Sequence, residues 1–395
     1  MYKLMGEVTN AQATARVEPK PQIERRRSRG YRGEVVYIYA FDVALGMQDL
    51  PISHLLGQTV TEFGIGQDKR SPREFSFYKP QMVKLPVQER VGPTGLVKVY
   101  RTIKLLPLGA VSITVRLPFE VDDLLHLVQF HDLEFEDGSL HREVRHLAEQ
   151  VVDELKTYYI KPHLPLVEEE AYTIFCLESP LVDEEGKIIS AESWFKLHRR
   201  EIAAVLTQEK DPSVLSDQEA EESTSMYLSY YKDDLVVVDW DAALIVDDPA
   251  EFDESIYIFE LANLQLSELE AYDRILDETL EQAYDDLSGK SLRSRRAILR
   301  DLKELRIDLT RFSDELQNIT KFFGDWHLAR VYERIARRFH LNEWHAAIDD
   351  KLRTLDSLYH LAAQEQDTRT MVWLETAIVV LFVLDVIIIL LGVHI

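Results

Sequence analysis

The stretch Asp234-Leu-Val-Val-Val-Asp-Trp-Asp-Ala-Ala-Leu-Ile-Val-Asp247 carries the strongest β signal in the chain. Runs of valine, leucine and isoleucine bounded by turn-forming residues are typical of β-strands. The aspartates around Trp240 interrupt the run, which predicts two strands that meet near Asp241. A strand-rich part of the chain precedes this stretch and a helix-rich part follows it, so the stretch marks the predicted end of a mixed α/β body.

Before this stretch, strand signals alternate with helix signals. The run 34–41 follows Gly33 and is rich in β-branched and aromatic residues. Pro107 and Gly109 separate two further β-rich runs, which predicts a hairpin. The remaining expected elements are a strand at 171–176, a helical stretch at 121–155 broken near Asp137-Gly138, a helix at 191–208, and an exposed polar loop at 211–224. Interspersed strands and helices predict an α+β fold class, with a mixed α/β domain over residues 34–247.

Beyond residue 255 the pattern is helical, and residues 255–370 predict a helical, coiled-coil-like stalk or hairpin. Its clearest feature is an apolar seam with alternating steps of 4 and 3 residues. The seam residues are Ile298, Leu302, Leu305, Leu309, Phe312, Leu316, Ile319 and Phe323. Such a seam packs either against a neighbouring helix of the same chain or against another subunit.

From Asn342 onward no glycine or proline occurs until Gly392. A continuous helix of about 50 residues is therefore expected, roughly 75 Å long at 1.5 Å per residue. Its first half is amphipathic, with Trp344, Ile348 and Leu352 on one stripe. Its second half, residues 371–393, predicts a single transmembrane helix at the C-terminus, because residues 376–393 are 18 residues with one charge.

Three polar or amphipathic residues mark the predicted membrane segment. Trp373 lies at its leading edge, where an interfacial indole is expected. Asp385 lies near mid-span, where a carboxylate costs about 2.5–3.5 kcal/mol on insertion scales. It is a tolerated neutral acid, a contact between copies of the helix, or part of an ion path. Glu375 precedes it by ten residues, which places the two acids on different helix faces.

Bulk composition limits the function classes. The chain has 395 residues, 46% of them hydrophobic, and a formal net charge of -24, which disfavours non-specific nucleic-acid binding by the body. Cys176 is the only cysteine and is expected in the core, so no intramolecular disulfide or cysteine-based metal centre is expected. Residues 1–33 form a polar leader with a basic cluster at 24–32, interpreted as a disordered tail, a nucleic-acid or anionic-lipid contact, or a transit peptide.

The sequence contains no phosphate-binding glycine loop, no dinucleotide-binding fingerprint and no serine nucleophile turn. Four histidines, His126, His131, His141 and His146, lie around Glu134 in the sequence. No two of them have the i, i+4 spacing that places two ligands on one helix face. Surface or capping roles are therefore preferred to a metal site, and no catalytic residue, metal or cofactor is predicted.

The C-terminal region resembles the Required for Meiotic Nuclear Division family over about 70 residues. Leu374-Glu375 opens the apolar helix, and Asp385-Val386 follows with the spacing seen in that family. The resemblance implies an α/β body, then helices and a C-terminal membrane helix. It also implies homo-oligomers, with mitochondrial members in the inner membrane and linked to mitochondrial translation.

Two functions are compatible with this sequence. The preferred one is a non-enzymatic, membrane-anchored scaffold or adaptor that forms homo-oligomers and presents its acidic domain to an unidentified cytoplasmic protein partner. The alternative is a divalent-cation channel, because the layout resembles magnesium channels of the CorA class, although the tripeptide Gly-Met-Asn of those channels is absent. A helix that ends two residues before the C-terminus is expected to insert after synthesis, leaving the body cytoplasmic. A bacterial inner membrane is preferred, with the mitochondrial inner membrane and a matrix-facing body as the alternative.

Overall fold

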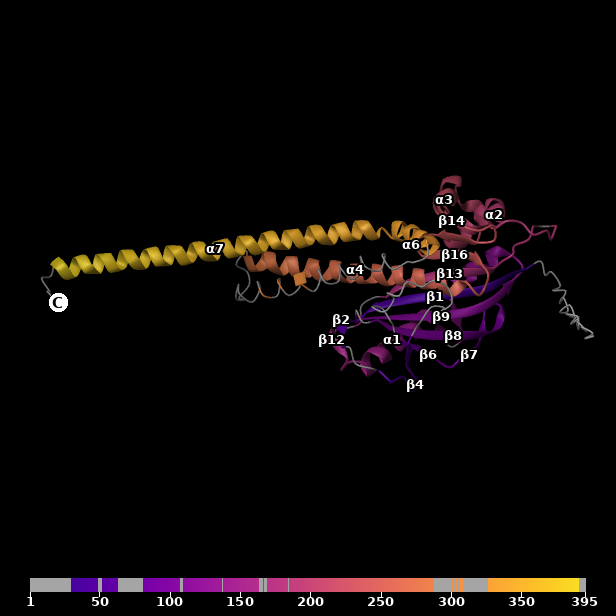
Figure 1. The fold of residues 1–395 in the computed structure, drawn as a ribbon, viewed down its shortest axis with the longest axis horizontal. Helices are drawn as coiled ribbons and strands as arrows, with labels where there is room; N and C mark the ends of the chain where they lie inside the picture. Colours follow the sequence, from indigo (N-terminus) through magenta and orange to yellow (C-terminus); the bar gives the residue numbers. More distant parts are fainter. Residues whose placement is uncertain are drawn as a thin grey trace, which may run out of the picture.

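The structure is a computed structural model, and its described part is a layered body from which one long helix projects (Figure 1). The described residues are 30–48, 52–62, 81–106, 109–136, 138–162, 166, 169–183, 185–287, 300, 303, 306–307 and 326–390. This confirms the predicted fold class, a mixed α/β N-terminal body followed by helices and one apolar helix end.

A 10-stranded sheet forms the middle layer of the body, in the order β14-β15-β16-β13-β1-β9-β8-β6-β5, with β7 paired to β8. Its neighbouring strands are antiparallel except β13 and β16, which are parallel. The strands are β1 (Tyr31–Asp42), β5 (Thr61–Glu62), β6 (Gln81–Lys84), β7 (Gln88–Gly92), β8 (Gly95–Leu106), β9 (Ala110–Val121), β13 (Glu170–Glu178), β14 (Met226–Leu228), β15 (Leu235–Val238) and β16 (Ala242–Asp247). Two-stranded ribbons are formed by β2 (Ala44–Met47) with β12 (Tyr159–Pro162), β3 (His54–Leu55) with β4 (Gln58–Thr59), and β10 (Glu134–Phe135) with β11 (Gly138–Ser139).

Strand β1 lies at the centre of the sheet and is buried on both faces. Val35, Tyr37 and Tyr39 enter one hydrophobic core, and Val36 and Ile38 enter the other. This division follows from the period of two along a strand. The run 34–41, which was predicted as a strand from its β-branched and aromatic content, therefore separates the two hydrophobic cores of the body.

The first face of the sheet is covered by η2 (Leu124–Phe130), α1 (Leu140–Glu154) and α2 (Ala191–Leu206). Helix α2 begins where the Ser190 hydroxyl accepts a hydrogen bond from the Ser193 amide, and it buries Trp194 against the sheet. The expected exposed loop at 211–224 is wrong in part, because it contains η3 (Pro212–Val214) and α3 (Asp217–Glu222). Ser216 caps α3 by accepting from the Glu219 amide, a local signal that outweighs the polar composition.

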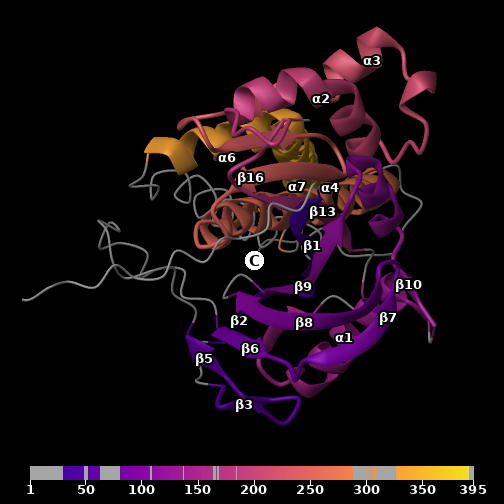
Figure 2. The ribbon, with the colours of Figure 1, turned by 90° about the vertical axis from the view of Figure 1, so that its right-hand side faces the viewer.

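The second face is covered by α4 (Phe252–Leu287), α6 (Trp326–Arg338) and the first turns of α7 (Leu341–Leu390) (Figures 1 and 2). Helix α4 runs for 36 residues because no glycine or proline interrupts it. Helix α7 follows α4 in the same direction, and the Lys351 ammonium lies 2.6 Å from an Asp273 carboxylate oxygen and 2.7 Å from one of Asp277. The long C-terminal helix expected from the sequence is thus present and begins at Leu341.

Buried ion pairs fix the helices on the second face. The Lys104 ammonium of β8 pairs with the Glu260 carboxylate of α4, and Ser112 donates to the same carboxylate at 2.6 Å. Arg338, at the end of α6, pairs with Asp239 in the turn between β15 and β16. Removing one partner of such a pair leaves an uncompensated buried charge, so these contacts fix where α4 and α6 dock.

The strands predicted at 34–41, 171–176 and around Asp241 are confirmed, as are the hairpin and the helix at 191–208. The expected helix at 121–155 is wrong over its first half, which holds the end of β9, η2 and the β10–β11 ribbon. The heptad seam from Ile298 to Phe323 lies outside the described residues, so both interpretations of it stay predictions. Residues 1–29 of the predicted leader also lie outside them.

Candidate functional site: an acidic pocket and an apolar helix end

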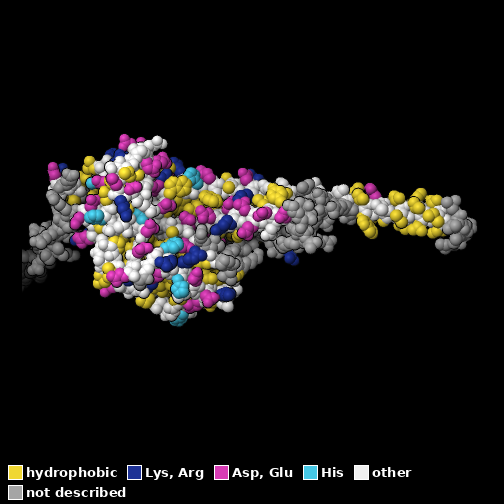
Figure 3. Space-filling model, turned by 180° about the vertical axis from the view of Figure 1, so that it is seen from behind, with side chains coloured by type: hydrophobic (Ala, Val, Ile, Leu, Met, Phe, Trp, Pro, Cys, Tyr) yellow, Lys and Arg dark blue, Asp and Glu magenta, His cyan; other side chains and the backbone are white. Residues whose placement is uncertain are grey.

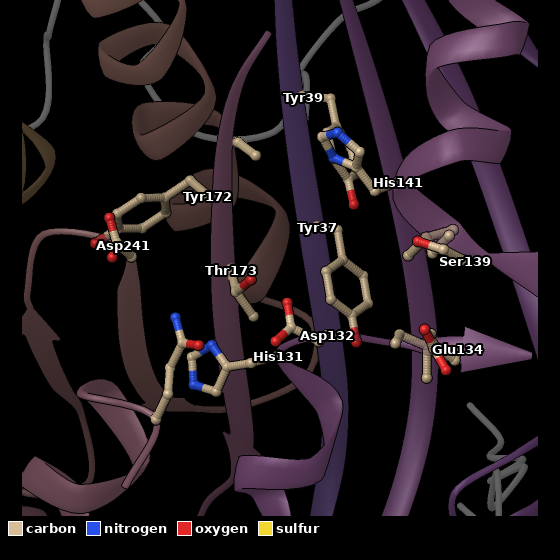
Figure 4. Close-up of a pocket in the computed structure, with 14 residues that line it drawn as sticks. Tyr37, Tyr39, His131, Asp132, Glu134, Ser139, His141, Tyr172, Thr173 and Asp241 are labelled. Atoms are coloured by element: carbon tan, nitrogen blue, oxygen red, sulfur yellow. The ribbon is translucent and has the colours of Figure 1, made fainter. Parts of the chain in front are cut away.

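A pocket of about 470 Å³ opens on the first face of the sheet (Figure 4). Its floor comes from the middle of β1 and the start of β13, where Tyr37 pairs with Thr173 and Tyr39 pairs with Ala171. The small side chains of Ala171 and Thr173 stand beside two large tyrosines. That difference in size contributes to a hollow that the helices of this face do not fill.

Acidic side chains form the rim of the pocket. Asp132 follows η2, Glu134 belongs to β10, and Asp241 lies in the turn between β15 and β16. The Thr173 amide donates to the Asp241 carbonyl at 3.1 Å, which holds this turn against the floor. In Figure 4 the Asp132 carboxylate lies between Thr173 and Tyr37, and Asp241 lies beside Tyr172. Neither lysine nor arginine occurs among the described residues that line the pocket.

The tyrosines of the floor carry neutral, protonated hydroxyl groups. Burial raises the pKa of Tyr37 well above its usual value, and burial also raises the pKa of Tyr39. The Tyr37 hydroxyl donates to the Phe130 carbonyl, whereas the Tyr172 hydroxyl donates to the Asp239 carbonyl at 2.8 Å. Phenolate chemistry is therefore disfavoured near neutral pH, and these rings provide apolar surface and hydrogen bonds.

His131 is held as a neutral imidazole at the edge of the pocket. Its Nε2 lies 2.6 Å from the Val205 carbonyl, which only accepts, so Nε2 carries a proton. Burial lowers the pKa of His131, while the nearby Asp132 and Asp241 carboxylates act in the opposite direction. The ring also lies edge-on to Phe175, with 5.0 Å between centroids. His131 thus forms a fixed part of the pocket wall, and its Nδ1 can accept a hydrogen bond.

His141 lies on the opposite side, against the ring of Tyr39. Its Nε2 is 2.9 Å from an oxygen of the Glu169 carboxylate, whose other oxygen accepts from Arg145 at 2.7 Å. The Glu169 side chain is buried, so this chain of contacts fixes the position of His141. Glu169 is paired with Arg145, whereas the three rim carboxylates form no ion pair with a described residue.

The histidine cluster noted in the sequence is only partly brought together. His131, His141 and Glu134 line the pocket, whereas His126 and His146 are exposed elsewhere. Among the described residues there is no group of three or more histidine, cysteine, aspartate or glutamate side chains placed to hold a metal ion. Cys176 is fully buried in the second core, as predicted.

Sequence reasoning missed Tyr37, Tyr39, Thr173 and Asp241 as pocket residues. A weak signal existed, because tyrosines two apart in a strand point to the same face. Their meeting with Thr173 and Asp241 depends on the pairing of β1 with β13 and of β13 with β16, which no local pattern encodes.

The far end of α7 is the second feature of functional interest. Residues Met371–Ile389 form 19 residues of mean hydropathy 2.6, none of them buried, so this segment has the length and composition to cross a membrane. Trp373 and Phe382 are 78% and 71% exposed. Figure 3 shows hydrophobic side chains covering this end of the molecule, whereas charged side chains are spread over the body.

The structure places the predicted membrane residues on this segment. Trp373 and Glu375 lie in its first turns and Asp385 lies further along, all with exposed side chains. None of the three side chains forms a hydrogen bond or an ion pair with a described residue of the body. Their predicted roles in membrane contact and assembly stay predictions.

Comparison with known proteins relates the body of this chain to an established family. The family described as "Uncharacterized protein MJ0711, N-terminal domain" matches residues 32–253, more than half of the chain. A relative from Methanocaldococcus jannaschii, "Uncharacterized protein MJ0711", is 23% identical over 314 residues, which cover 79% of this chain and 92% of that protein. No solved structure matches the chain.

The match shows that the resemblance to the Required for Meiotic Nuclear Division family is wrong. The family model that matches this chain is that of the MJ0711 N-terminal domain, over residues 32–253, and the similarity to the Methanocaldococcus jannaschii protein, over 314 residues, extends beyond this range. The pairs Leu374-Glu375 and Asp385-Val386 lie in an apolar helix of restricted composition, where a few acidic positions recur easily. The implied mitochondrial membrane and the link to mitochondrial translation are withdrawn with that resemblance.

Proposed function

The chain belongs to the family of the MJ0711 N-terminal domain, and we propose that it is a non-enzymatic, membrane-anchored adaptor. In this proposal the helix end Met371–Ile389 spans a membrane, and copies of the chain form homo-oligomers. The acidic body faces the cytoplasm and is presented there to a protein partner.

One observation carries this proposal: the helix that docks into the body is the same helix that bears the apolar segment. The first turns of α7 bury Ile348 and Leu355 in the second core. The helix then continues without interruption to its apolar end (Figure 1). A connection through one continuous helix restrains the body relative to the membrane more than a flexible linker would.

The exposed apolar end supports insertion into lipid. Large side chains such as Leu381, Phe382 and Ile389 are exposed around the segment. Transferring each such side chain from water to an apolar medium stabilises it by about 1.5–3 kcal/mol. The backbone of a helix satisfies its own hydrogen bonds, so the segment can enter hydrocarbon without leaving polar groups unpaired.

The geometry of α7 sets the distance between body and membrane. From Leu355, the last core residue among the described side chains of α7, to Met371 at the start of the apolar segment, the helix rises by about 24 Å. Arg353 and Arg369 lie on the body side of the segment, which agrees with a cytoplasmic body. The net charge of -24 favours a partner with a basic surface.

The divalent-cation channel remains an untested alternative. Channels of the CorA class use two spanning helices, and the described residues contain one helix end suited to span a membrane. A cluster of metal-ligating side chains is also absent among those residues. No observation therefore favours the channel over the adaptor.

Membrane association and sidedness test the proposal together. We expect the full chain to stay in the membrane pellet after alkaline carbonate washing, and a truncation after Thr370 to become soluble. Protease added to the cytoplasmic face should digest the body of the full chain. Carbonate release of the full chain would remove the anchor from the proposal, and protection of the body from cytoplasmic protease would refute its orientation.

A further inference from the structure

Two pocket residues that are largely buried have hydroxyl groups with no hydrogen-bond partner among the described residues. Thr173 and Tyr39 are only 9% and 6% exposed, both line the pocket, and neither side-chain hydroxyl bonds to another described residue. Neither oxygen is among the fully buried polar atoms that lack a partner, so each is accessible, and water or a ligand can supply the hydrogen bond that such groups normally form. Figure 4 shows Thr173 facing the same space as Asp132. The floor of the pocket therefore offers two hydrogen-bonding groups to a molecule that enters it.

The charge of the pocket sets the sign of that molecule. The carboxylates of Asp132, Glu134 and Asp241 accept no hydrogen bond from another described residue and form no ion pair with one. Because no lysine or arginine is among the described lining residues, the carboxylates repel anions and attract cations.

The walls favour an organic cation over a bare metal ion. Tyr37 and Tyr39 present aromatic surface, and aromatic faces attract ammonium and guanidinium groups. The carboxylates come from three separate elements, and no metal-holding group of side chains is formed by the described residues. The volume of about 470 Å³ also suits a small organic molecule, since such sites range from about 300 to 1,000 Å³.

We propose that this pocket binds a small organic cation with N–H donors, of the alkylammonium, amidinium or guanidinium class. The N–H groups of the ligand donate to Asp132 and Asp241 at the rim and to the hydroxyl of Thr173 on the floor. The apolar part of the ligand lies against Tyr37 and Tyr39. This site is separate from the anchor and does not depend on the adaptor function.

A matched pair of probes tests the charge requirement. Benzamidine and benzamide have nearly the same shape, but only benzamidine is a cation. With the full chain in detergent, isothermal titration calorimetry should show benzamidine binding at least about tenfold more tightly than benzamide, the difference that a charge-assisted hydrogen bond provides. Equal affinities, or no binding of benzamidine, would overturn the proposal, and so would Mg²⁺ displacing benzamidine at equimolar concentration.

Substitutions locate the binding. Asp132→Asn should weaken benzamidine binding about threefold to tenfold, and Thr173→Val should weaken it about threefold while keeping the shape of the side chain. Glu136→Gln is the matched control, because Glu136 is exposed two residues from Glu134 and does not line the pocket. Thermal unfolding of each variant checks that it folds. If Glu136→Gln weakens binding as much as Asp132→Asn in folded proteins, the cation binds to the general acidic surface and the proposed site is wrong.

Discussion

Glu170 begins strand β13 close to α4, and its ionisation is unfavourable in the folded body. Burial, together with the nearby carboxyls of Glu270 and Asp241, raises the pKa of Glu170 to about 7. Its backbone carbonyl accepts a hydrogen bond from Asn263 at 2.9 Å, a contact independent of the side-chain charge. A raised folded pKa means that the folded state binds the proton more tightly than the unfolded state.

From this we predict the pH dependence of stability for Glu170→Gln. The stabilising contribution of protonated Glu170 is present below its ordinary pKa and is lost as pH rises to about 7. At pH 8 the variant should therefore be more stable than the natural protein by on the order of 1–3 kcal/mol, and at pH 4.5 the two should be about equal. Denaturant unfolding at both pH values measures the difference.

The matched control is Glu178→Gln at the other end of β13, where Arg32 is a nearby charge. It should not show a gain in stability confined to high pH. A gain of the same size in both variants would mean that lower total negative charge, and not the surroundings of Glu170, stabilises the body.

Single residues differ in how well the sequence predicts their surroundings. Cys176 lies between apolar residues of one strand, so its burial follows from a local pattern, and it is fully buried. The unpaired hydroxyl of Thr173 does not follow from such a pattern, because it depends on which side chains from β1 and the turn at Asp241 lie beside it. Local sequence predicts burial better than it predicts hydrogen-bond partners.

At the scale of elements, the docking of α4 on the sheet depends on a buried charge pair. Lys104 of β8 and Glu260 of α4 are both nearly fully buried, and Ser112 adds a hydrogen bond to the same carboxylate. Glu260→Gln removes the carboxylate charge that pairs with the nearly fully buried Lys104 ammonium. We predict that this variant is destabilised by about 3–5 kcal/mol.

A double-variant cycle separates this effect from packing. Lys104→Met with Glu260→Leu removes both charges while keeping apolar volume, and should be destabilised much less than Glu260→Gln alone. Lys196→Met is the control on the exposed pair of α2, where we expect a loss of about 0–0.5 kcal/mol. Denaturant unfolding followed by tryptophan fluorescence measures all three. A double variant as unstable as Glu260→Gln would show that the pair itself, not an unpaired charge, holds α4.

The elements themselves could largely be predicted, whereas their arrangement could not. The two strands that meet at Asp241 and the helix at 191–208 follow from hydrophobic runs and turn residues within single windows of sequence. The sheet order depends on pairings such as that of β1 with β13, which are more than a hundred residues apart. The short helix α3 was missed because the polar composition of its stretch predicts a loop, whereas the cap at Ser216 favours a helix there.

At the scale of the whole molecule, the body and the apolar helix end carry different information. The family model matches residues 32–253, whereas the resemblance drawn from the sequence rested on the C-terminal helices. A membrane segment is constrained mainly to be long and apolar, so unrelated segments converge in composition. The strands and pocket of the body are constrained by specific pairings, so similarity there is the better guide to relationship.

The apolar end of α7 is also expected to control how copies of the chain assemble. Asp385 is exposed in the single chain and lies within the proposed span. A carboxylate near the middle of a membrane costs about 2.5–3.5 kcal/mol on insertion scales, and a contact between copies of the helix would offset part of that cost. We therefore predict that the full chain in mild detergent is a defined homo-oligomer, and that Asp385→Leu shifts it toward the monomer.

Mass measurement of the detergent-solubilised protein tests this with two further variants. A truncation after Thr370 should be monomeric if assembly requires the apolar end. Glu375→Gln should keep the oligomer, because ten residues of helix turn Glu375 to a different face from Asp385. If the truncation stays oligomeric, copies associate through the remaining chain. That result would favour contacts between subunits, over packing within one chain, as the role of the seam from Ile298 to Phe323. If the full chain is itself a monomer, α7 serves only as a tether, and the adaptor must engage its partner as a single body.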